Sequence, residues 1–202
     1  MRRGGLDLTS CTTQAYHCEM SHNAILNLAE RYAEHYSDGL IVSPRFTEAP
    51  SSCEVSRDPE HIRWRPQPQI PEVNFERIEA ALECPIHHSI RDFYQSLWCG
   101  PLHLTFEDAP VDLIQLWNEA DFEHLIENIF GHYLQQKRFK QAFTFFFATG
   151  DESSEAIYSV ENETGRVVRE IPGPTGVQTG VAEDLSEFLN RLNCRARGEL
   201  SA

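Results

Sequence analysis

The chain has 202 residues, 41% of them hydrophobic and 24% charged, a composition that supports one folded domain with an ordinary core. Its 31 acidic residues outnumber 17 lysines and arginines, which gives a formal net charge of −14 at pH 7. A charge of this sign disfavours nucleic acid and anionic lipid headgroups as partners. No apolar run approaches the roughly 18 residues of a membrane-spanning helix, and no signal peptide is recognisable, so we expect a cytosolic protein without direct lipid insertion.

The N-terminal part of the chain differs from the rest. Residues 1–19 are small and polar without usable periodicity, and we expect a disordered extension or an upstream translation start before Met20. Ser21 is expected to cap a first helix that ends at residues 38–39. The next expected elements are short strands at 53–56 and 61–65, a helix that Asn74 caps, and a helix that Pro85 starts.

The second half shows clearer periodicity. Alternating apolar residues predict a strand at 102–106 with a hairpin partner at 111–117. The strongest helix carries seven apolar residues at helical spacing, namely Phe122, Leu125, Ile126, Ile129, Phe130, Tyr133 and Leu134. The later expected elements are a central strand at 143–149, a hairpin of 156–160 with 166–171 around Gly165, an exposed loop at 173–180, and a helix at 185–192.

Helices and strands are thus interleaved, and two hairpins rule out a purely parallel sheet. We therefore predict a single α+β domain over residues 20–195, with a mixed or largely antiparallel β-sheet packed with helices. Residues 196–202 are predicted to form a disordered tail. Trp64 and Trp117 are expected in the core or at its edge.

One segment concentrates the negative charge. Residues 92–136 contain eight carboxylates and no lysine or arginine, and the segment ends in Lys137, Arg138 and Lys140. Segregated charge creates a surface field that selects partners of opposite sign, so we expect a basic polypeptide as partner.

The acids of this segment fall into two groups. Glu119, Asp121 and Glu123 lie at the start of the predicted long helix, where the helix dipole by itself favours negative charge. Glu107, Asp108 and Asp112 lie in a hairpin, which has no such dipole, and so they carry more of the functional argument. The predicted partner-binding acids are Glu107, Asp108, Asp112, Glu119, Asp121, Glu123 and Glu127, with Asp151, Glu152 and Glu155 as a second group.

Catalytic and metal-binding patterns are weak in this sequence. His124, Glu127 and His132 share helical spacing, but the further ligands of a helical metal site are missing. The sequence contains no glycine-rich phosphate loop and no nucleophile elbow. We therefore predict a non-enzymatic protein without metal or cofactor. A hydrolase that uses a carboxylate pair stays open as an alternative, because sequence cannot measure the distance between two carboxylates.

Five separated blocks of the sequence are IRWRPQP at 62–68, IQLWNEADF at 114–122, ENIFGH at 127–132, QKR at 136–138 and LSEFLN at 185–190. In this order they resemble one known family, Syd, the SecY-interacting proteins of Gram-negative bacteria. The resemblance runs from about residue 21 to about residue 193. We expect Glu127, Asn128 and His132, which lie in a matched block, to line the same face as the acids.

The resemblance implies an α+β fold of the SUKH superfamily and a non-catalytic protein that binds the translocon subunit SecY. It also implies a peripheral position on the cytoplasmic side of the inner membrane, with a soluble cytoplasmic pool. The implied role is to sequester uncomplexed or misassembled SecY or to regulate translocation negatively. An immunity-type module that neutralises a toxin, a role found elsewhere in the superfamily, is the other open alternative.

Overall fold

A large antiparallel sheet organises the computed structural model, which describes residues 8–36, 39–43, 49–150 and 155–196, with side chains from Ser21 onward. Within these residues seven strands follow the order β11-β10-β9-β8-β7-β6-β12, and every neighbouring pair is antiparallel. Their bounds are β6 Leu102–Phe106, β7 Ala109–Leu113, β8 Thr144–Thr149, β9 Ile157–Glu161, β10 Val167–Ile171, β11 Val177–Ala182 and β12 Asn193–Cys194.

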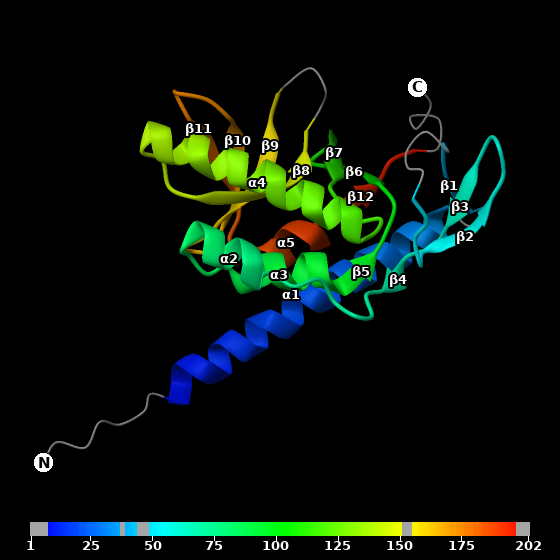
Figure 1. The fold of residues 1–202 in the computed structure, drawn as a ribbon, viewed down its shortest axis with the longest axis horizontal. Helices are drawn as coiled ribbons and strands as arrows, with labels where there is room; N and C mark the ends of the chain where they lie inside the picture. The colour runs from blue at the N-terminus through cyan, green and yellow to red at the C-terminus, as the bar shows by residue number, and fades with distance from the viewer. Residues whose placement is uncertain (1–7, 37–38, 44–48, 151–154, 197–202) are drawn as a thin grey trace, which may run out of the picture.

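Two small sheets and the helices complete the domain. The small sheets have the orders β1-β3-β2 and β4-β5, with β1 Leu40–Val42, β2 Glu54–Arg57, β3 Ile62–Trp64, β4 Gln67–Pro68 and β5 Leu97–Trp98. The helices of the described chain are α1 Leu8–His35, α2 Glu76–Leu82, α3 His88–Ser96, α4 Glu119–Phe139 and α5 Leu185–Asn190. Figure 1 shows the three-stranded sheet at one end of the molecule, beside the C-terminal end of α1. The predicted single-domain α+β fold is confirmed.

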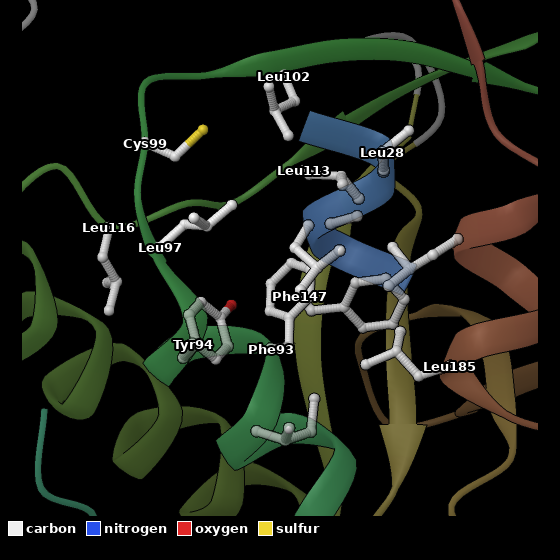
Figure 2. Close-up of a cluster of buried hydrophobic side chains, with 14 of the residues drawn as sticks. Leu28, Phe93, Tyr94, Leu97, Cys99, Leu102, Leu113, Leu116, Phe147 and Leu185 are labelled. Carbon is white, nitrogen blue, oxygen red and sulfur yellow. The ribbon is translucent and has the colours of Figure 1, made fainter. Parts of the chain in front are cut away.

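Strand β8 lies in the middle of the large sheet and is covered on both faces, as its apolar run predicts. On one face Phe147 packs against Phe93 of α3 and Phe188 of α5, with ring centroids 5.7 and 5.4 Å apart. On the other face Thr144 and Phe146 meet His132 of α4. Figure 2 shows this core, where side chains of α1, α3, β5 to β8 and α5 converge. Trp64 and Trp117 are both buried, as predicted.

A tight two-residue turn connects β6 and β7 into a hairpin. Strands β6 and β7 pair from Leu102 with Leu113 to Phe106 with Ala109. The two residues between them, Glu107 and Asp108, have φ angles of 50° and 66°. Two successive positive φ values are typical of the type I′ turn, whose twist matches that of the flanking strands.

Three predicted boundaries were wrong. Helix α1 begins at Leu8 and not at Ser21, since residues 8–20 contain no proline or glycine to interrupt it. The Ser21 side chain is buried against Ser186 instead of capping a helix. Helix α3 starts at His88, where His87 accepts a hydrogen bond from the Ser89 amide, and not at Pro85. The domain boundary at Met20 and the tail at 196–202 stay predictions.

The expected exposed loop at 173–180 is the third correction. Gly173 and Gly176 have positive φ angles and lie in the turn, but Gly180 belongs to strand β11. Glycine weakens a strand locally, which is why the pattern suggested a loop. Pairing along β10, from Ile171 with Val177 to Val167 with Ala182, supplies the hydrogen bonds that local sequence does not reveal.

Candidate functional site

An acidic groove lies where the first turns of α2 and α4 come together. Its residues are Glu72, Val73, Asn74, Glu76 and Arg77 from the first helix and its approach, and Glu119, Ala120, Phe122, Glu123 and Ile126 from the second. The groove has a volume of about 710 Å³. Its four glutamates face a single lining arginine, which leaves a formal charge of −3.

Hydrogen bonds at the start of α4 determine the shape of that side of the groove. Asn118 caps the helix, since its Oδ1 accepts hydrogen bonds from the amides of Ala120 and Asp121 at 3.0 and 3.2 Å. The Asp121 carboxylate turns back and accepts from the Trp117 amide at 2.9 Å. Asp121 thus holds the helix start, and Glu119 and Glu123 point outward as the exposed acids of the first turns.

The α2 side is built in a similar way. Asn74 Oδ1 accepts from the Glu76 amide at 2.8 Å and starts the helix. Phe75 is buried, with its ring centroid 5.2 Å from that of Phe122, and this contact joins the two helix starts. Because both helices present their N-terminal turns here, their dipoles offset part of the repulsion among the glutamates.

The groove is weakly neutralised. Arg77 Nη2 lies 2.9 Å from Glu123 Oε2, but 73% of the arginine side chain and 50% of the glutamate side chain are exposed. Exposed pairs of this kind contribute at most about 1 kcal/mol, because water screens them. The groove therefore keeps a negative potential toward an approaching cation.

The hairpin acids occupy a different environment. Glu107 pairs with Arg191, whose guanidinium also lies over the Phe106 ring at 4.6 Å. Asp112 lies between Arg195 Nη2 at 2.8 Å and His103 Nδ1 at 2.7 Å. Two of the three hairpin acids are thus already paired within the fold, and none of the three lines the groove.

The remaining predicted acids are dispersed. Asp108 is exposed in the β6–β7 turn, and Glu127 is exposed on α4 one turn beyond Glu123. Glu155 is exposed with a φ angle of 47°. Asp151 and Glu152 lie outside the described residues. The structure therefore brings together Glu119 and Glu123 and adds Glu72 and Glu76, which the sequence interpretation missed.

His132 does not lie on the exposed face with Glu127, contrary to expectation. The Glu127 and Asn128 side chains are exposed, whereas only 7% of the His132 side chain is. It points into the sheet, with Nε2 3.2 Å from Thr144 Oγ1 and 3.5 Å from Glu170 Oε1. His132 follows Glu127 by five residues, which is almost one and a half helical turns, so the two side chains lie on opposite sides of α4.

Glu170 is the centre of a buried polar network. Its carboxylate accepts hydrogen bonds from Thr144 at 2.6 Å, Ser159 at 2.5 Å and Gln178 at 2.7 Å. Burial raises the pKa of Glu170, but hydrogen bonds from His132 and these three side chains outweigh it, and the pKa falls to about 2. Both oxygens are engaged, so this carboxylate supports the packing of α4 on the sheet.

Within the described residues, no set of three or more His, Cys, Asp or Glu side chains is arranged to hold a metal ion. None of the described helices combines the length and apolar character needed to cross a bilayer.

Comparisons with known proteins point to one family. The family model for the Syd protein (SUKH-2) matches residues 22–194. The chain is 34% identical over 177 residues to "Protein Syd" of Shigella flexneri, an alignment that covers 86% of this chain and 97% of the relative. It is 35% identical, with the same coverage, to "Protein Syd" of Escherichia coli O81 (strain ED1a). The chain therefore belongs to the Syd protein family.

Proposed function

We propose that this protein binds SecY at the cytoplasmic face of the inner membrane, without catalysis, through the acidic groove between α2 and α4. Four glutamates with one exposed arginine carry the proposal, because cytoplasmic loops of membrane proteins are rich in lysine and arginine. Complementary charge accelerates encounter with such loops and sets their orientation.

The same negative charge determines whether lipid or a protein partner brings the protein to the membrane. The anionic leaflet repels an acidic surface by roughly 1 kcal/mol per nearby charge, so membrane association depends on the protein partner and not on lipid. Binding of this kind sequesters SecY that is uncomplexed or misassembled, or it regulates translocation negatively. Glu127 extends the contact surface along α4, and Asp108 and Glu155 are exposed acids outside the groove.

Charge reversal with a matched control tests the proposal. Glu72→Lys/Glu123→Lys changes the net charge by +4 within the groove, and Glu34→Lys/Glu163→Lys makes the same change at exposed positions outside it. We expect the groove variant to lose binding to detergent-solubilised SecY, and the control variant to keep most of it. We also expect wild-type binding to weaken steeply as salt rises from about 0.05 to 0.5 M.

Two results would contradict the proposal. Binding of the groove variant with wild-type affinity would show that SecY contacts another surface. Equal loss in both variants would show that net charge, and not the groove, determines binding. Thermal unfolding of all variants checks that they are folded, since the exchanged side chains are exposed.

A further inference from the structure

Helix α4 carries an apolar ridge that starts at the edge of the core and continues onto the exposed surface. Ile126, Phe130 and Leu134 follow one another at intervals of four residues, so they form one row along the helix. Ile126 is half-buried, whereas Phe130 and Leu134 are 38% and 49% exposed. Leu125 and Ile129, which α4 buries in the domain, lie on a neighbouring face, and the row itself begins at Phe122, which is buried against Phe75.

This apolar ridge runs directly out of the acidic groove. Ile126 lines the groove, and Phe130 follows one turn later, about 6 Å along the helix axis. Glu119, Glu123 and Glu127 form a second row at the same four-residue spacing, immediately beside the apolar one. The exposed side of α4 thus presents two parallel rows, one acidic and one apolar, and the helix ends in Lys137 and Arg138.

Building on the proposed function, we propose that the segment bound at this surface is a basic amphipathic α-helix that lies along α4. Its apolar row contacts Ile126, Phe130 and Leu134, and its neighbouring basic row meets the glutamates. The two parallel rows on α4 favour a helical partner. A helix also carries side-chain rows at four-residue spacing, and two adjoining rows of the partner can contact the acidic and the apolar row of α4 at the same time. An extended segment directs successive side chains to opposite sides, so it offers α4 a single row.

The charge distribution along α4 also determines where the basic residues of the bound helix lie. Its basic residues lie over the first turns of α4, near Glu119 and Glu123. Its opposite end lies near Lys137 and Arg138 and lacks basic residues, because like charges there repel. The apolar contacts make part of the binding resistant to salt, which purely electrostatic binding would not be.

Two synthetic peptides of identical lysine and leucine content test this inference. In one peptide the leucines occupy a single row with lysines beside them, and in the other the same residues are scrambled. The full chain should bind the amphipathic peptide at least about tenfold more tightly. Circular dichroism should show that this peptide becomes more helical on binding.

Phe130→Gln/Leu134→Gln should remove this preference and leave a weaker, salt-dependent binding of both peptides. The matched control Ile171→Thr/Val177→Thr replaces two apolar side chains of similar exposure, 39% and 57%, on β10 and β11 and should keep it. Equal affinity of the wild-type protein for both peptides would overturn the inference. So would a preference that survives in the α4 variant, or binding without gain of helix.

Measurements with SecY separate this inference from the proposed function. If Phe130→Gln/Leu134→Gln binds SecY like the wild type while Glu72→Lys/Glu123→Lys does not, the proposed function stands and the helical mode is wrong. If wild-type protein does not bind SecY but retains the peptide preference, the proposed function is wrong and the α4 surface recognises a basic amphipathic helix of another protein.

Discussion

Arg77 provides a test in which binding should improve. It is the single cation among the lining residues of the acidic groove, and it pairs with Glu123 at 2.9 Å. Arg77→Gln changes the formal charge of the lining from −3 to −4 and releases Glu123 for a partner. Two unit charges about 6 Å apart in water interact by roughly 0.7 kcal/mol, which corresponds to about a threefold change in affinity.

We therefore expect Arg77→Gln to bind detergent-solubilised SecY about threefold more tightly at low salt, with the gain disappearing near 0.5 M salt. The free energy of unfolding should change by less than about 1 kcal/mol, since the lost ion pair is exposed. Arg166→Gln is the matched control, because Arg166 pairs with Glu183 at 3.8 Å and lies outside the groove. Unchanged or weaker binding by folded Arg77→Gln, or an equal gain in the control, would refute the electrostatic reasoning.

Three further predictions concern stability. Glu170 has a pKa of about 2 against an ordinary 4.5, so its stabilisation is complete above pH 4.5 and is lost as pH falls toward 2, by on the order of 3 kcal/mol. Glu170→Gln should be less stable at pH 7 in urea unfolding, and a gap to wild type that does not narrow by pH 3 would argue against this. Gly100→Ala should destabilise by about 1–3 kcal/mol, because its Cβ would lie 2.5 Å from the buried Trp64 ring. Gly131→Ala, with nothing within 4 Å, should instead raise the thermal midpoint.

Local patterns predicted most of the elements. Alternation located β6, the apolar run located β8, and Gly165 with a φ angle of 80° marked the β9–β10 hairpin as expected. These features depend on side-chain periodicity and backbone freedom within a few residues. Helix α4 was also predicted, but its seven apolar residues gave no sign that Phe130 and Leu134 would stay exposed. When a helix carries more apolar residues than the core can bury, its sequence pattern is the same whether or not another element covers the additional ones.

The candidate site was predicted in part. Sequence identified a lysine-free acidic segment and placed Glu119 and Glu123 at a helix start, where they are found. The interpretation of the sequence relied mainly on the hairpin acids. In the structure, however, Glu107 and Asp112 are paired with Arg191 and Arg195, about eighty residues later in the chain. Such pairs form only when distant segments meet, so no local pattern indicates them.

The amino-acid sequence by itself determined the sign of the charge, the α+β class, the order of the elements and the family, because these follow from composition, periodicity and similarity. Only the tertiary structure decided which carboxylates remain free to meet a partner. It packs α2 against α4 through Phe75 and Phe122, and so adds Glu72 and Glu76 to the acids of α4. A surface field depends on distances in space, and the fold alone sets those distances.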